Sequence, residues 1–216
     1  MTTRFSDSSP TAPRLPSLFA RWRRRLWVVR VLGQGARLWA LRRYAEPAQR
    51  RARRVAEATL GDSGRLVFVC HGNIMRSAFA TRVVHERFPQ HATRVVGGGT
   101  HAKAGRPAQD AALTVAAQMQ LPMTNHRATP LDALMLREHD VVVCMDALNE
   151  ANVLAAYPAL APRVFRVGDI GAVREMVPLA DRELHDPYGK GELVTRAAFE
   201  VLRSLASGWA AHQFRR

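Results

Sequence analysis

Cysteine is scarce in this sequence, with Cys70 and Cys144 as its only occurrences among 216 residues. Two cysteines do not make the disulfide framework of a small secreted protein, so a reducing cytoplasm is the expected compartment. Long apolar runs are also lacking. The best candidate, LWVVRVL, is interrupted by Arg30 and falls short of the ~20 apolar residues of a transmembrane helix. A secretory signal is not expected, because arginines continue through this stretch.

Lysine is almost absent, and arginine supplies nearly all of the positive charge. Lys103 and Lys190 are the only lysines, while the net charge is +14. Residues 1–60 hold 14 arginines against three acidic residues, which gives them a net charge of +11 and leaves +3 for residues 61–216. The basic character therefore belongs to the N-terminal segment.

Composition divides the chain into three parts. Residues 1–17 are rich in Ser, Thr and Pro and are predicted to be disordered. Residues 18–60 are predicted to form a basic, Trp- and Arg-rich helical extension with a break at Gly33–Gly35. Such a helix packs on the domain or a second chain, or lies on an anionic membrane surface; nucleic acid is an unlikely partner. Residues 61–216 are predicted to form the compact domain.

Strand and helix patterns alternate through the compact domain. Four short apolar runs, each typical of a strand buried on both faces, are separated by amphipathic helical segments. The predicted strands are residues 65–70, 92–98, 139–146 and 163–169, and the predicted helices are residues 75–88, 107–120, 147–158 and 195–212. This alternation predicts an α/β three-layer sandwich, with a four-stranded parallel sheet and helices on both faces.

The segment VFVCHGNIMRSAFA, residues 67–80, places Cys70 where a buried strand ends and a helix begins. In parallel sheets, ligands bind beyond the C-terminal ends of strands. Gly72 and Asn73 belong to the residue types that most readily adopt left-handed backbone angles. Such a turn can direct successive N–H groups into one concavity, where the helix N-terminus adds partial positive charge. The segment is predicted to bind a tetrahedral anion.

Two side chains beyond the turn suit phosphate chemistry. The guanidinium of Arg76 can bind two oxygens of a phosphoryl group. A sulfur in this positive field is expected to exist as the thiolate, to which Ser77 can donate a hydrogen bond. The loop is therefore predicted to hold a phosphate and to direct the Cys70 nucleophile at it.

A thiolate that attacks phosphorus expels an oxygen leaving group, which needs a proton. The stretch HDPYG, residues 185–189, supplies a candidate acid in Asp186. Asp186 precedes a proline and lies in a predicted loop before the last helix, and loops commonly carry catalytic groups. Without the cysteine loop, an ordinary Asp-Pro turn would be the better interpretation.

These motifs together resemble those of the low-molecular-weight protein tyrosine phosphatases. VFVCHGNIMRS is similar to the family's active-site loop and DPYG to its general-acid loop, and the resemblance covers residues 64–212. The short segment after Thr100 is similar to the bacterial branch that is linked to exopolysaccharide. The resemblance implies a phosphatase of aryl phosphates, most notably protein phosphotyrosine, that uses no metal or other cofactor.

The resemblance also implies a role for each matching residue. Cys70 would be the nucleophile, Arg76 the phosphate-binding residue and Asp186 the general acid and base. Asn73 would hold the loop backbone, and Tyr188 would form a wall of the cleft. The remaining members would be the phosphate-binding loop residues His71, Gly72, Ile74, Met75 and Ser77, and the supporting residue His126.

Several positions depart from the family pattern. Met75 stands where a second cysteine often protects the nucleophile from oxidation, and only Cys144 remains as a further thiol. Ala78 replaces a proline and Gly98 replaces a serine. Two alternatives stay open: a phosphotyrosine- or anion-binding module without turnover, and an arsenate reductase on the same scaffold, which would need further thiols.

The resemblance extends to partners and place in the cell. Bacterial relatives often reverse tyrosine kinases, so the expected substrate is a phosphotyrosine protein, with a membrane tyrosine kinase as one candidate. The expected localisation is cytoplasmic, with residues 18–60 able to hold the enzyme at the inner membrane surface.

Overall fold

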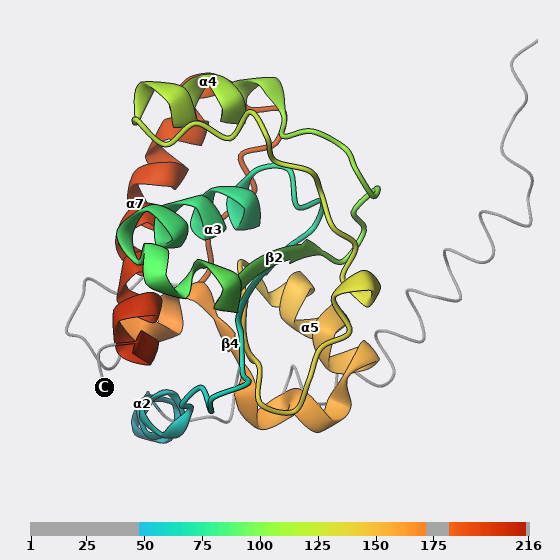
Figure 1. Cartoon of the computed structure of the whole chain (residues 1–216), viewed down its shortest axis with the longest axis vertical. Coiled ribbons are helices and arrows are strands. Elements are labelled where there is room, and N and C mark those ends of the chain that lie inside the picture. The colour runs from blue at the N-terminus through green and yellow to red at the C-terminus, as the bar shows by residue number, and fades with distance from the viewer. Residues whose placement is uncertain (1–47, 172–181, 215–216) are drawn as a thin grey trace, which may run out of the picture.

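The computed structural model describes residues 48–171 and 182–214 (Figure 1). The predictions for residues 1–17 and for most of the basic extension, including the break at Gly33–Gly35, fall outside these ranges.

A single parallel sheet forms the middle layer of the domain. Its strands are β1 (Leu66–Cys70), β2 (Val95–Gly99), β3 (Val141–Cys144) and β4 (Val164–Arg166). They run parallel in the order β2-β1-β3-β4. The sheet is central because its apolar runs can be buried on both faces. The predicted α/β sandwich with a four-stranded parallel sheet is confirmed.

Helices cover both faces of this sheet. The helices α3 (Arg76–Arg87), α4 (Asp110–Gln118) and α7 (Gly191–Phe214) lie together on one side, and α5 (Ala147–Ala156) lies on the other (Figure 1). The described residues also form short 3-10 segments: η1 (Pro89–Arg94), η2 (Asp132–Leu134), η3 (Pro158–Arg163) and η4 (Val167–Ile170).

The sheet separates two hydrophobic cores. On the side of α3 and α7, Phe79 stacks on Phe199 with ring centroids 3.9 Å apart, and Cys70 belongs to this core. On the side of α5, the core contains Val69 and Cys144, which are register partners across β1 and β3. Successive strand residues point to opposite faces, so Cys70 and Cys144 lie on opposite sides of the sheet.

The last part of the predicted basic extension packs on the domain. Helix α2 (Ala48–Glu57) sends Arg54 over the ring of Phe165, and Arg54 Nη1 donates to the carbonyl of Val164 at 2.8 Å. The carbonyl of Val55 accepts a hydrogen bond from His212 Nε2 at 2.9 Å. Helix α2 therefore lies beside β4, the edge strand of the sheet, and it also contacts η4.

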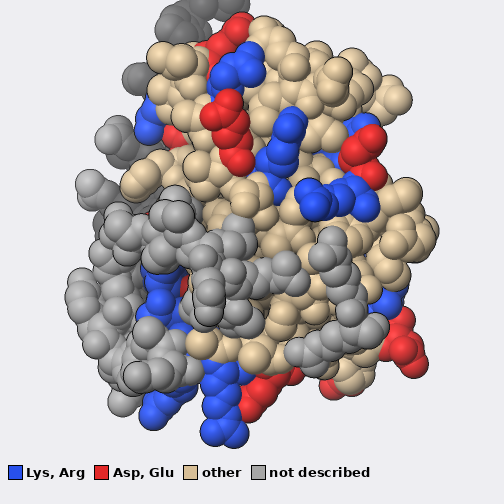
Figure 2. Space-filling view, turned by 90° about the vertical axis from the view of Figure 1, so that its left-hand side faces the viewer, with Lys and Arg blue, Asp and Glu red and all other residues tan. Residues whose placement is uncertain are grey.

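Charge on the side formed by α7 is mixed. Figure 2 shows basic and acidic side chains interspersed there among uncharged residues, over the part of this face that is drawn in colour. Within residues 48–171 and 182–214, no helix has both the length and the apolar character needed to cross a membrane.

Candidate active site

The loop after β1 forms the floor of a cleft at the carboxyl end of the sheet. Cys70 is the last residue of β1, and α3 begins at Arg76. The loop between them rests on Gly99 of β2. A Cβ at Gly99 would lie 2.8 Å from backbone atoms of His71, Gly72 and Asn73. Glycine at this position therefore allows the loop backbone to sit directly on the neighbouring strand.

Asn73 holds the loop in its turn. Its φ of +50° is in the left-handed region, which asparagine tolerates better than most residues. Its side chain donates to Ser77 Oγ at 2.8 Å and accepts from the backbone N–H of Thr129 at 2.9 Å. Its own N–H lies 3.2 Å from Cys70 Sγ and donates to it. The backbone turn and one donor to the sulfur thus come from the same residue.

Ser77 is the second polar neighbour of the sulfur. Its Oγ lies 3.0 Å from Cys70 Sγ and 3.2 Å from the carbonyl of Gly98. Since Asn73 already donates to this oxygen, the one hydroxyl hydrogen can go either to the sulfur or to the carbonyl. Loss of the Cys70 proton favours the sulfur, because hydrogen bonds to a charged acceptor are the stronger ones.

Arg76 links the loop to two carboxylates although its side chain is only 1% exposed. Nη1 donates to Asp146 Oδ2 at 2.7 Å and to the carbonyl of Leu184 at 2.8 Å. Nη2 forms an ion pair with Asp186 Oδ2 at 2.9 Å. Nε is buried and has no hydrogen-bond partner among the described residues. One guanidinium donor thus has no acceptor within the described part of the chain.

Asp146 was not assigned a role by the sequence. It lies two residues after Cys144, the buried end of β3, and its Oδ1 also accepts from the N–H of Asn149 to cap α5. Its place beyond a strand end, beside that of Cys70, is the signal that would have indicated it.

Asp186 reaches the site from a loop that runs across the strand ends. The N–H of Leu184 donates to the carbonyl of Met145 at 2.8 Å, which fixes the loop against the end of β3. The side chain of Asp186 is 45% exposed and accepts from the N–H of Tyr188 at 3.3 Å. The carboxyl group is therefore held beside Arg76 while it remains open to the cleft.

His126 supports the loop from behind. Its Nε2 lies 2.6 Å from the carbonyl of Asn73, which can only accept, so this nitrogen carries the hydrogen. Burial lowers the pKa of His126, although the bond to Asn73 opposes this change. The imidazole therefore favours the neutral form and acts as a fixed donor to the loop.

The cleft above the sulfur has a volume of about 750 Å³. Besides Cys70, Arg76 and Asp186, the predicted residues His71, Gly72, Ile74, Met75 and Tyr188 line it. Three further lining residues, His101, Lys103 and Arg106, were not predicted. The rings of His71 and His101 stack with centroids 4.5 Å apart, and Lys103 and Arg106 are exposed. The mouth of the cleft is therefore basic and partly aromatic.

The second cysteine lies apart from this site. Cys144 is fully buried in the core on the α5 side of the sheet, whereas Cys70 faces the α3 side. Neither cysteine is in a disulfide. The sheet itself separates the two thiols, so Cys144 cannot pair with Cys70 without unfolding of the strands.

A thiol at a strand end, an arginine at the following helix start and a carboxyl group from a distant loop meet over a four-stranded parallel sheet. This combination of fold and site defines the class of small cysteine-dependent phosphatases. The match of residues 65–215 to the model of the low molecular weight phosphotyrosine protein phosphatases shows the family more closely. The chain belongs to this family and is a phosphatase.

Individual relatives and solved structures agree with this assignment. The low molecular weight protein-tyrosine-phosphatase Wzb of Salmonella typhi is 30% identical over 146 residues, 68% of this chain and 91% of that protein. The structure of the tyrosine phosphatase AmsI of Erwinia amylovora has a TM-score of 0.61 and 25% identity, and covers 72% of this chain and 99% of its own. The YwlE arginine phosphatase of Geobacillus stearothermophilus has a TM-score of 0.57 and 25% identity, and covers 68% of this chain and 90% of its own.

Proposed function

We propose that this protein hydrolyses phosphotyrosine on protein substrates through a phosphocysteine formed at Cys70. The observation that carries the proposal is the convergence of Cys70, Arg76 and Asp186 on one cleft. The buried Nε of Arg76 has no acceptor among residues 48–171 and 182–214, and an oxygen of a bound phosphoryl group would supply one.

In the first step, the Cys70 thiolate attacks phosphorus. A sulfur–phosphorus bond forms while the bond from phosphorus to the tyrosine oxygen breaks. Asp186 gives its proton to the departing phenolate, which leaves as tyrosine. Arg76 and the N–H groups of the loop bind the equatorial oxygens, where negative charge is concentrated in the transition state. The N–H of Asn73 donates to the sulfur and the hydroxyl of Ser77 lies 3.0 Å from it, so both can donate to the thiolate as it attacks.

In the second step, water hydrolyses the phosphocysteine. Asp186, now a carboxylate, takes a proton from the water as its oxygen attacks phosphorus. The sulfur–phosphorus bond breaks, the thiolate returns to its two donors, and inorganic phosphate leaves. The cycle needs no oxidant, reductant or metal ion, since every proton and electron pair stays within the protein, substrate and water.

The walls of the cleft favour an aryl phosphate. Tyr188 is 54% exposed at the mouth, and the stacked rings of His71 and His101 also line it. Aromatic walls can stack on the ring of a phosphotyrosine.

The two alternatives find less support. Arsenate reduction by this chain would need a second thiol near Cys70, but Cys144 lies on the other side of the sheet. A pure binding module would not need a carboxyl group beside the phosphate site, where its charge opposes anion binding. The ion pair between Asp186 and Arg76 therefore favours turnover over capture.

The experiment that tests the proposal measures phosphate release from a phosphotyrosine peptide and from p-nitrophenyl phosphate. We expect Cys70→Ser to abolish turnover and Asp186→Asn to lower it by about 10²–10⁴-fold. Cys144→Ala removes the other thiol and is expected to leave turnover within about threefold of the wild type, as its site lies across the sheet. A wild type that binds vanadate without releasing phosphate would instead identify a binding module.

We further propose that the substrate is a membrane tyrosine kinase and that residues 18–60 hold the phosphatase at the inner membrane surface, in a role tied to exopolysaccharide production. Each arginine close to an anionic bilayer contributes about 1 kcal/mol of binding. Replacement of Arg21, Arg23, Arg24 and Arg25 by Gln in the full chain is expected to abolish co-sedimentation with phosphatidylserine vesicles, while catalysis continues. Equal sedimentation of the wild type and this variant contradicts the membrane role.

A further inference from the structure

A group of buried charges beside the cleft has no part in the mechanism above. Arg166, the last residue of β4, and Glu150 of α5 are each 1% exposed, and Arg166 Nε lies 2.7 Å from Glu150 Oε2. Transfer of such a pair from water costs several kcal/mol per ion, and well-packed apolar residues are often as stable. Stability alone is therefore a weak explanation for these charges.

The same charges hold the start of the loop that carries Asp186. Arg166 Nη1 forms an ion pair with Glu183 Oε1 at 3.0 Å. The preceding residue, Arg182, pairs through Nε with Asp169 of η4, and its carbonyl accepts from the N–H of Gly168 at 3.2 Å. Two successive loop residues are thus fixed to the end of β4 and to η4.

Backbone contacts of Leu184 define the path of the loop together with these ion pairs. Residues 182–187 form no helix or strand, and Asp186 lies three residues after Glu183. Between them, Leu184 bonds to the carbonyl of Met145, and its own carbonyl accepts from Arg76. The position of the Asp186 carboxyl group over the cleft therefore depends both on these contacts of Leu184 and on where Glu183 is held.

We infer that Arg166 is a positioning residue for the general acid. Its planar guanidinium binds Glu150 on one edge and Glu183 on another, and so transmits the fixed position of α5 and β4 to the loop. A lysine at this position would keep the charge but could not hold both carboxylates with a fixed geometry. The inference rests on the proposed role of Asp186.

The experiment compares two substrates whose leaving groups differ in basicity. Proton donation matters most when the leaving oxygen is strongly basic, as in phenyl phosphate, and least for p-nitrophenyl phosphate. We expect Glu183→Gln to lower kcat/KM for phenyl phosphate by about tenfold and for p-nitrophenyl phosphate by less than about threefold. Arg166→Lys is expected to change the ratio of the two values in the same direction. A substitution that only loosens the fold would lower both alike.

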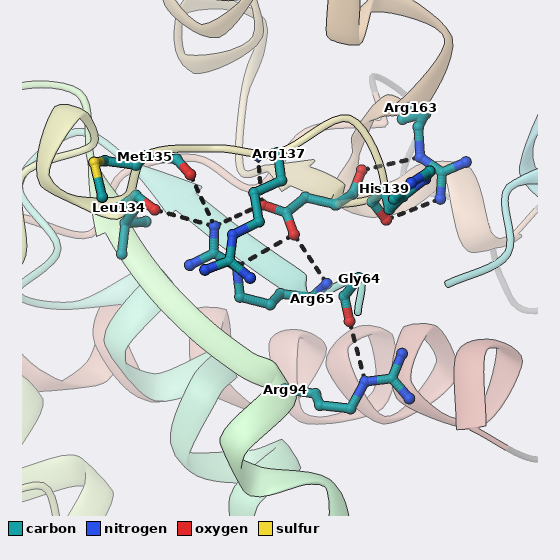
Figure 3. A network of polar contacts seen from close by, with 9 residues as sticks. Gly64, Arg65, Arg94, Leu134, Met135, Arg137, His139 and Arg163 are labelled. Atoms are coloured by element: carbon teal, nitrogen blue, oxygen red, sulfur yellow. Dashed lines mark hydrogen bonds and ion pairs between the residues drawn. The ribbon is translucent and has the colours of Figure 1, made fainter. Parts of the chain in front are cut away.

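A matched control lies at the other end of the sheet. Asp140 is fully buried and pairs with Arg65 at 2.7 Å. Figure 3 shows Arg65 in this network, with Leu134, Met135, Arg137 and Arg163 around it. Asp140→Asn also removes a buried charge, and we expect it to lower Tm without a change in the ratio.

These variants distinguish a failure of the positioning role of Arg166 from a failure of the general-acid role of Asp186. If Asp186→Asn leaves the ratio of the two kcat/KM values unchanged, the proposed general acid is wrong. If Asp186→Asn changes the ratio but neither Glu183→Gln nor Arg166→Lys does, only the positioning role of Arg166 is overturned. In an Asp186→Asn background, Glu183→Gln should have no further effect on the ratio, since both act through one proton transfer.

Discussion

Nη2 of Arg76 lies 2.9 Å from Oδ2 of Asp186, so the proposed phosphate-binding cation and the proposed acid are paired before any substrate arrives. An incoming phosphate must compete with this carboxylate for Arg76. The carboxyl group of Asp186 is 45% exposed, so water screens its charge and the pair is a modest barrier to binding.

Asp186→Asn should therefore strengthen oxyanion binding while it impairs turnover. We expect inhibition by vanadate or phosphate to become about two- to fivefold tighter, because the competing charge is gone. Inhibition constants and kcat measured on the same preparations check this. Weaker inhibition in the variant would mean that the carboxyl group assists anion binding.

Asn73 offers a test of the loop backbone. Because its φ is +50°, Asn73→Ala should be less stable than Asn73→Gly by about 1 kcal/mol, the reverse of the usual order in regular structure. Both variants lose the side-chain bonds to Ser77 and Thr129, so both should lose activity. Chemical denaturation and kcat/KM measure the two effects.

Gln120 provides the control for this pair. Gln120 lies two residues after the end of α4, away from the cleft, and its φ is +62°. Replacement by Ala and by Gly should give the same order of stability with no change in kcat/KM. A loss of activity there would show that the effect at Asn73 is a general response to destabilisation.

Oxidation should inactivate the enzyme without recovery. Met75 lines the cleft beside Cys70, and Cys144 is shielded by the sheet, so no thiol can trap a Cys70 sulfenic acid as a disulfide. After peroxide treatment, dithiothreitol is expected to restore little activity, and mass spectrometry should find sulfinic acid at Cys70. Met75→Cys should convert this into recoverable inactivation; full recovery of the wild type contradicts the prediction.

His126 should make stability depend on pH. Burial holds its pKa below the usual value near 6.5, so the folded state favours the neutral imidazole. Its contribution is fully present above about pH 6.5 and is lost as the pH falls through the folded-state pKa. Tm of His126→Gln should fall less steeply with acid than that of the wild type. Equal slopes for the wild type and His126→Gln would contradict the prediction.

Lys103 and Arg106 should favour acidic substrates. Both are exposed and line the mouth of the cleft, so acidic residues beside a phosphotyrosine would lie near them. We expect kcat/KM to rise by about two- to fivefold for Glu-flanked over Ala-flanked peptides, and the difference to shrink with salt. Lys103→Glu with Arg106→Glu should reverse the preference. Arg203→Glu, a charge change outside the cleft, should leave the preference for acidic peptides unchanged.

The sequence by itself determined the layered fold and the core of the site. Four apolar runs separated by amphipathic helices are local patterns, and they specify a parallel sheet because such runs must be buried on both faces. The Gly-Asn turn between Cys70 and Arg76 is local as well, and Asp186 was predicted as the acid from an equally short motif.

Only the tertiary structure decided which distant residues complete the site. These residues come from segments that are well separated in the chain. They are Asp146, the ion pair of Arg166 with Glu183, and the basic residues Lys103 and Arg106 at the mouth of the cleft. The isolation of Cys144 depends on strand register, since a shift of one residue would turn its side chain to the face of Cys70. The local sequence pattern does not predict this register. The register is decided when strands and helices pack together, because packing determines which side chains are buried on each face of the sheet.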